Sequence, residues 1–248
     1  MIVCEIGLNH LGKEDYANEY IDEIIKSKAD ALTFQVREKE FYEKDESYLR
    51  LKDDYYKEAF EKTKSSNRKF GVAIADQEAV DFFESLGTDF YKVLSKDIAN
   101  FALIDTLLDT NKPIFISSGM SDFGEISKLV EHVEGAKERV SLIHTQLSYD
   151  IKDVNLRAIS LLREKFDLPV AFGNHSPNHT VLFLSLAFQP SDLFMYVKGA
   201  RTTNHPDEEH AVSLEDIGEI ISNVIELPQS LGTGTKIEMN NVIEEKNL

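Results

Sequence analysis

The stretch Phe90-Tyr91-Lys92-Val93-Leu94-Ser95-Lys96-Asp97 contains the pattern that decides the fold. In this stretch, a short and mostly apolar run is followed directly by polar side chains. Strands that are covered on both faces in a parallel sheet have this nearly continuous apolar character. The same pattern recurs along the chain and predicts these strands: Ile2–Ile6, Ala31–Val36, Lys69–Ile74, Phe90–Leu94, Pro113–Ser117, Val140–His144, Pro169–Phe172 and Leu193–Val197.

Segments with helical spacing of apolar residues lie between these strands. Leu103, Ile104 and Leu107 form the stripe of a helix that packs on a sheet, and Tyr48–Lys64 is a more polar helical segment. Strand alternating with helix throughout indicates a parallel α/β fold. A barrel of eight such units typically needs about 250 residues, and the chain has 248. We therefore predict a single (β/α)8 TIM barrel.

An open, doubly wound sheet is the alternative fold. Its first strand–helix turn would carry a glycine-rich dinucleotide pattern, which Gly7–Lys13 lacks. No linker or low-complexity tract divides the chain. We expect one barrel over residues 1–236 and a frayed tail over residues 237–248.

The charge and the cysteine content limit the partners and the compartment. The chain carries 27 basic and 44 acidic residues, a formal charge of −17, which argues against nucleic acid or membrane surfaces as main partners. Cys4, the only cysteine, lies in an apolar run and is expected to be a small buried thiol. Neither a signal peptide nor a membrane-spanning run is expected, so we predict a cytoplasmic protein.

In such barrels the chemistry lies at the carboxyl ends of the strands. Polar residues follow seven of the eight predicted strands, as an enzyme site requires. These residues are Glu5, Asn9 and His10; Thr33 and Gln35; Lys92, Ser95 and Asp97; Ser117 and Ser118; His144, Gln146 and Tyr149; Asn174 and His175; Lys198 and Arg201. For His144 two interpretations stay open, a role in the site or the ordering of a loop.

Several strings, taken in order along nearly the whole chain, resemble the sialic acid synthase (N-acetylneuraminate synthase) family, catalytic barrel only. They are Cys4-Glu5-Ile6-Gly7-Leu8-Asn9-His10-Leu11-Gly12, Ala29–Gln35, Phe90–Asp97 with Asn100, Lys112–Met120, Asp153–Ile159 and Ser213–Glu215. The resemblance implies a TIM barrel that condenses phosphoenolpyruvate with an amino-sugar aldehyde in carbohydrate biosynthesis. It also implies a divalent metal, Mn or Mg, that polarises the aldehyde, and a homodimer.

The resemblance also assigns roles to single residues. Glu5, Asp97 and Tyr149 match catalytic positions that contact the sugar or the reacting centre. The substrate-binding positions are Gln35, Lys92, Ser95, Ser117 and Ser118, of which Lys92, Ser95 and Ser117 match those that hold phosphoenolpyruvate. His175 matches one of two metal-binding histidines. An ammonium group and hydroxyls at strand ends are suitable ligands for a phosphate or carboxylate.

Other positions depart from the family pattern. Thr33 replaces a lysine, Leu147 an asparagine, Gly173 a serine and Asn174 an aspartate, and Gly199 stands where the second metal histidine is expected. We therefore expect weak metal binding through His175. Replacement ligands could come from His179, His205 or His210, for which a solvent-exposed loop or helix position is the commoner alternative.

Two hypotheses on function follow. The first is a nonulosonic acid synthase-like enzyme, a C–C bond-forming transferase. The second is a diverged barrel that binds a sugar or a protein partner without synthase activity, or acts on another substrate. Compared with the family that the chain resembles, we expect no C-terminal antifreeze-like domain after the barrel. We therefore expect the segment Arg37–Lys52, or a second subunit, to cover the mouth of the barrel.

Overall fold

Eight parallel strands close into a barrel in the computed structural model, which describes residues 1–44 and 46–236. Neighbouring strands pair in chain order, and β1 also pairs with β8, which closes the ring. The strands are β1 (Ile2–Gly7), β2 (Ala31–Val36), β3 (Lys69–Ile74), β4 (Phe90–Val93), β5 (Ile114–Ser117), β6 (Val140–His144), β7 (Val170–Asn174) and β8 (Leu193–Lys198). A two-residue strand, β9 (Val212–Ser213), pairs in parallel with the end of β8. The predicted (β/α)8 fold is confirmed, and each predicted strand end is right to within two residues.

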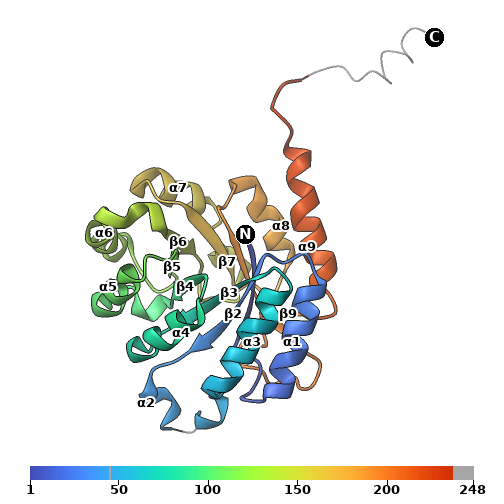
Figure 1. Cartoon of the computed structure of the whole chain (residues 1–248). Coiled ribbons are helices and arrows are strands. Elements are labelled where there is room, and N and C mark those ends of the chain that lie inside the picture. The colour runs from blue at the N-terminus through green and yellow to red at the C-terminus, as the bar shows by residue number, and fades with distance from the viewer. Residues whose placement is uncertain (45, 237–248) are drawn as a thin grey trace, which may run out of the picture.

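Helices surround the barrel (Figure 1). They are α1 (Glu14–Lys26), α2 (Lys39–Tyr42), α3 (Asp53–Ser65), α4 (Val80–Leu86), α5 (Phe101–Asp109), α6 (Phe123–His132), α7 (Arg157–Phe166), α8 (Thr180–Ser185) and α9 (Ile217–Glu226). None of the helices in the described part of the chain combines the length and the hydropathy needed to cross a bilayer.

The helix predicted over Tyr48–Lys64 begins later than expected, at Asp53. Ser47–Leu49 forms a separate 3-10 turn, and Lys52 is extended at the helix start. Two carboxylates, Asp53 and Asp54, occupy the first turn, where the exposed N–H groups of a helix favour negative charge. At the other end of the chain, Leu227–Leu231 forms a 3-10 turn. The predicted tail, residues 237–248, lies outside the described residues.

The apolar side chains form two layers, one inside the barrel and one between strands and helices. The inner layer consists of Val3, Ala31, Phe90, Phe115, Ile143, Ala171 and Phe194. Cys4 points into the outer layer and is fully buried, as expected, and burial raises the pKa of its thiol to about 12. The inner rings fill the lower barrel, so any ligand must enter at the carboxyl ends of the strands.

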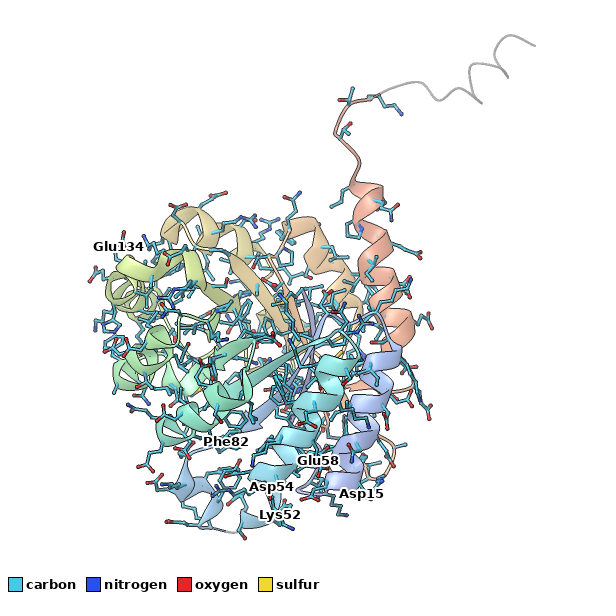
Figure 2. The ribbon with its side chains drawn as sticks, viewed as in Figure 1. Asp15, Lys52, Asp54, Glu58, Phe82 and Glu134 are labelled. Atoms are coloured by element: carbon cyan, nitrogen blue, oxygen red, sulfur yellow. The ribbon has the colours of Figure 1, made fainter. Side chains whose placement is uncertain are left out.

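The outer faces of the helices carry the negative charge. Figure 2 labels Asp15 on α1 and Asp54 and Glu58 on α3, all three exposed. The two helices lie side by side and are joined by the ion pair of Lys62 with Asp22 at 2.7 Å. The excess of acidic residues is thus largely a solvated surface.

Candidate active site

The alternation of side chains along a strand explains why polar groups gather in the barrel mouth. Successive side chains point to opposite faces of a strand, so residues two apart share a face. Glu5 lies two residues after Val3, Lys92 two after Phe90, and Ser117 two after Phe115. The inner apolar layer therefore continues upward as a polar layer. Each of these sequence-predicted residues is buried inside the barrel.

Glu5 and Lys92 form an ion pair across the barrel interior. Their side chains are only 3% and 5% exposed. The rings of Phe194 and Tyr196 lie 5.5 and 5.4 Å from the Lys92 ammonium group. A buried ion pair is costly to desolvate and depends on each partner being present. The structure thus brings together the predicted acid/base group and the predicted phosphate-binding cation.

Two predicted serines lie beside this pair. The hydroxyl groups of Ser95 and Ser117 are 2.7 Å apart, and both residues line the mouth. A Cβ atom at Gly119 would lie 3.0 Å from the Ser95 hydroxyl and 2.7 Å from Thr145, so the glycine keeps this corner open. Ser118, by contrast, donates its hydroxyl hydrogen to the carbonyl of Ile143 at 2.9 Å.

An open cavity of about 240 Å³ occupies the carboxyl ends of the strands. Its lining consists of Gln35, Arg37, Lys92, Leu94, Ser95, Lys96, Ser117, Met120, Leu147, His175, Tyr196 and Asp207. Arg37 shows that the segment after β2 reaches the mouth, although Tyr48 in the same segment is 61% exposed. Two of the predicted catalytic residues, Asp97 and Tyr149, do not line this cavity: Asp97 pairs with Lys96 at 3.0 Å, and Tyr149 is 55% exposed. A homodimer that covers this rim stays a prediction.

Asp207 is a site residue that the sequence reasoning missed. It comes from the loop between β8 and β9, and its backbone N–H donates to the side chain of Asn9 at 3.1 Å. Gly7 has a left-handed φ of +57°, and a Cβ atom there would lie 3.2 Å from the Asp207 carboxylate. Burial, together with the negative charge of Glu5, raises the pKa of Asp207 to about 7. The length of this loop could have pointed to Asp207 from the sequence, because loops of more than about 12 residues in compact domains are commonly functional.

His175 lies at the mouth as predicted, with its Nδ1 atom 2.7 Å from the hydroxyl of Thr145. Its imidazole stacks on that of His210, with ring centroids 4.4 Å apart. Burial, assisted by the charge of Lys92, lowers the pKa of His210 to about 4. For His205 and His210 the expected solvent exposure is wrong, since they are 5% and 3% exposed. Their burial depends on partners far away in sequence, which local pattern does not reveal.

Two further histidines that the sequence singled out lie close to backbone carbonyls. His144 lies 2.9 Å through Nε2 from the carbonyl of Val154, in line with the loop-ordering interpretation. His179 is half-buried and lies 3.2 Å through Nε2 from the carbonyl of His210.

A buried network holds the loop that carries Asp207 and His210. The Tyr16 hydroxyl lies 2.7 Å from His205 Nε2, and His205 Nδ1 lies 2.6 Å from the Glu208 carboxylate. Glu208 in turn pairs with Lys198 at 2.7 Å. The desolvation of Glu208 is outweighed by its bonds to Lys198 and His205, which lower its pKa to about 2.

Thr33 stands where the family pattern has a lysine, and its buried hydroxyl has no hydrogen-bond partner among the residues that the structure describes. A buried hydroxyl without a partner costs about 1–3 kcal/mol. We expect Thr33→Val, which keeps the side-chain shape, to raise the free energy of unfolding by about 1 kcal/mol in denaturant titrations. Unchanged or lower stability would show that Thr33 is hydrogen-bonded in solution. Thr110→Val is a matched control, because the Thr110 hydroxyl donates to a backbone carbonyl and its loss should destabilise.

Comparison with known proteins supports the class that the fold and the site define, a (β/α)8 barrel with a polar, ionisable mouth. The NeuB family model matches residues 18–236. An uncharacterized protein of Methanocaldococcus jannaschii is 30% identical over 255 residues, which cover 96% of this chain and 74% of that protein. The human N-acetylneuraminate-9-phosphate synthase is 26% identical over 260 residues, with 95% and 72% covered.

A solved structure shows the same fold. The N-acetylneuraminic acid (sialic acid) synthetase of Leptospira borgpetersenii, in complex with citrate, superposes with a TM-score of 0.88 at 24% identity, over 99% of this chain and 90% of that one. The chain belongs to the NeuB family, whose members include sialic acid synthases. The predicted family is confirmed.

Proposed function

We propose that this protein is a nonulosonic acid synthase that condenses phosphoenolpyruvate with an amino-sugar aldehyde. The observation that carries the proposal is the buried Glu5–Lys92 pair beside the hydroxyls of Ser95 and Ser117, at the open end of the barrel. Family membership supports the reaction class.

Two kinds of group serve this reaction. Lys92, Ser95 and Ser117 can bind the phosphate and carboxylate of the donor through charge-assisted hydrogen bonds. In the condensation, C3 of the enolpyruvate forms a bond to the aldehyde carbon, the aldehyde oxygen takes a proton, and water releases inorganic phosphate to leave a 2-keto acid. The buried Glu5 and the half-buried Asp207 are carboxyl groups at the mouth that can hold or move the protons.

The direct test is product formation by the purified chain. Phosphoenolpyruvate is incubated with N-acetylmannosamine and, separately, with its 6-phosphate, the aldehyde obtained when pyruvate is subtracted from the product named for the human relative. Inorganic phosphate and the mass of the new 2-keto acid are both measured. Aldehyde-dependent release of phosphate with the matching product mass is the expected result.

Ser117→Ala provides the site-specific prediction. Loss of one hydrogen bond to a charged group costs about 1.5–3 kcal/mol, so kcat/KM for phosphoenolpyruvate should fall about 10- to 150-fold. Ser65→Ala, an exposed serine on α3, is the control and should leave the rate unchanged. A Ser117→Ala enzyme with wild-type kcat/KM would remove this serine from the donor site.

The alternative hypothesis is a barrel that binds a sugar without synthase activity. It predicts a different result in these assays. Calorimetric binding of the sugar with no product under any donor would establish it. Thr33, Leu147 and Gly199, which replace a lysine, an asparagine and a metal histidine of the family pattern, favour this alternative.

A further inference from the structure

The residues at the mouth do not fit the metal ion that the family resemblance implies. Between residues 1 and 236, Asp45 apart, no three His, Cys, Asp or Glu side chains are placed to hold an ion together. Gly199 stands where the second metal histidine is expected, and a Cβ atom there would lie 2.6 Å from the Tyr16 hydroxyl. Contacts for an unassigned ligand are better defined in a second cavity.

This second cavity, of about 200 Å³, lies between the segment that follows β2 and the helices α3 and α4. Figure 2 labels Phe82, which forms part of its wall on α4. Arg37 borders both this cavity and the mouth, whereas Lys92 and Ser117 line the mouth and not this cavity. A ligand in the second cavity would therefore lie beside the reacting groups and not among them.

Four aromatic side chains line the cavity: Tyr42, Tyr56, Phe82 and Phe83. The Tyr56 ring is held edge-on by Phe34 and Phe83, with ring centroids 5.7 and 5.2 Å apart. An apolar cavity of about 150 Å³ binds benzene. A cavity of this size and lining can therefore take a planar ring that carries one small substituent.

A buried hydroxyl without a partner lies at this cavity. Tyr56 is 4% exposed, and its hydroxyl forms no hydrogen bond with any residue that the structure describes. Burial raises the pKa of this hydroxyl well above its usual range, and the nearby charges of Arg50 and Asp53 act on that pKa with opposite signs. Both of those residues line the cavity, so the hydroxyl lies on the cavity side of α3. Nearly all buried polar groups in proteins are paired, which makes this free donor a ligand contact.

The charges that line the cavity balance. They are three cations and three carboxylates: Arg37, Lys39 and Arg50, and Asp53, Asp76 and Glu78. Lys39 and Glu78 pair with each other, and Arg37 pairs with Glu38 at 3.1 Å. Asp76 accepts the backbone N–H of Glu78 at 3.0 Å. A multiply charged anion such as phosphate therefore gains little net attraction here.

Arg50 is the cation of this cavity that forms no ion pair within the described part of the chain, and its guanidinium lies 5.8 Å from the centroid of the Tyr42 ring. A guanidinium presents a planar set of N–H donors that matches a carboxylate, and a phenolic hydroxyl can donate to the same group. We propose that this cavity binds a small planar monocarboxylate, with the carboxylate on Arg50 and the Tyr56 hydroxyl and the apolar body against Phe82 and Phe83. The site goes beyond the synthase reaction and does not depend on it.

The probe is 4-fluorobenzoate, and its binding to the purified chain is followed by ¹⁹F NMR without substrates. Arg50→Gln and Tyr56→Phe should each weaken binding about tenfold or more, since each removes a hydrogen bond to a charged group. The neutral 4-fluorobenzamide, of nearly the same shape, should bind more weakly for the same reason. Arg157→Gln, exposed on α7, and Tyr55→Phe, whose hydroxyl donates to Asn18, are the controls and should bind as the wild type does. Unchanged affinity in either cavity variant, or a wild-type protein that does not bind the probe at millimolar concentration, overturns the proposal.

A second measurement shows where the probe binds. In protein labelled with ¹³C-tyrosine, 4-fluorobenzoate should shift the ring signals of Tyr42 and Tyr56 and leave that of Tyr16 in place. Tyr196 lines the mouth and reports binding there. Shifts at Tyr196 without shifts at Tyr42 and Tyr56 would place the probe in the mouth and refute the proposal. A probe bound at Tyr42 and Tyr56 in a protein that forms no 2-keto acid would uphold it and refute the synthase reaction instead.

Discussion

Replacing Lys92 with Met is expected to destabilise the folded protein by about 3–5 kcal/mol at pH 7, the usual cost of removing one partner of a buried ion pair. Glu5 would be left as a desolvated charge, because it is only 3% exposed. The double variant Glu5→Gln/Lys92→Met should recover most of the loss, since removing both charges leaves no unpaired ion. Lys128→Met, on the exposed face of α6, should change stability by less than about 0.5 kcal/mol.

Chemical denaturation of the four proteins measures this directly. If Lys92 holds the donor, calorimetry of the double variant should show phosphoenolpyruvate binding weakened by about 1.5–3 kcal/mol. A single variant as stable as the wild type would mean that the ion pair does not persist in solution.

Acidification from pH 7 to pH 5 is expected to remove about 2 kcal/mol of stability through His10 alone. Burial lowers the pKa of His10 to about 3, from the ordinary histidine value of 6.5. The folded state therefore binds its proton less readily than the unfolded state. The stability that His10 contributes is present above pH 6.5 and is lost as the pH falls toward 3.

His10→Asn tests this assignment by denaturant titration at pH 5, 6 and 7. In the wild type, His10 Nδ1 accepts the backbone N–H of Gly12 at 2.9 Å, and an asparagine oxygen can do the same. The variant should be less stable at pH 7 but should lose about 2 kcal/mol less between pH 7 and pH 5. An identical pH slope in both proteins would show that His10 does not titrate over this range.

The barrel could be predicted from the sequence because its signal is local. Runs such as Ile114–Ser117 are apolar on both faces, and their spacing fixes eight strands. The positions of Glu5, Lys92 and Ser117 could be predicted for the same reason. A polar residue two positions after a residue that is buried inside the barrel must point into the barrel as well.

The rest of the site depends on contacts that no local pattern contains. Asp207 and His210 lie in a loop without periodicity, and they reach the mouth because Asn9, Tyr16 and Gly7 hold or admit that loop. His205 is buried by Tyr16, 189 residues earlier in the chain. Charged and polar loop residues are commonly exposed, so exposure was the reasonable but incorrect expectation for both histidines.

Hydrogen bonds between the first and last βα units of the barrel affect when in folding the site can form. Asn9 donates to the carbonyl of Val197, and the two residues are 188 positions apart. Contacts of such separation form late, because a long segment of chain must be closed before they are gained. A chain emerging from the ribosome can build most of its strands before the residues that bind Asn9 and Tyr16 at the mouth have been synthesised. Binding competence would then be acquired in one final step, when the eighth strand meets the first.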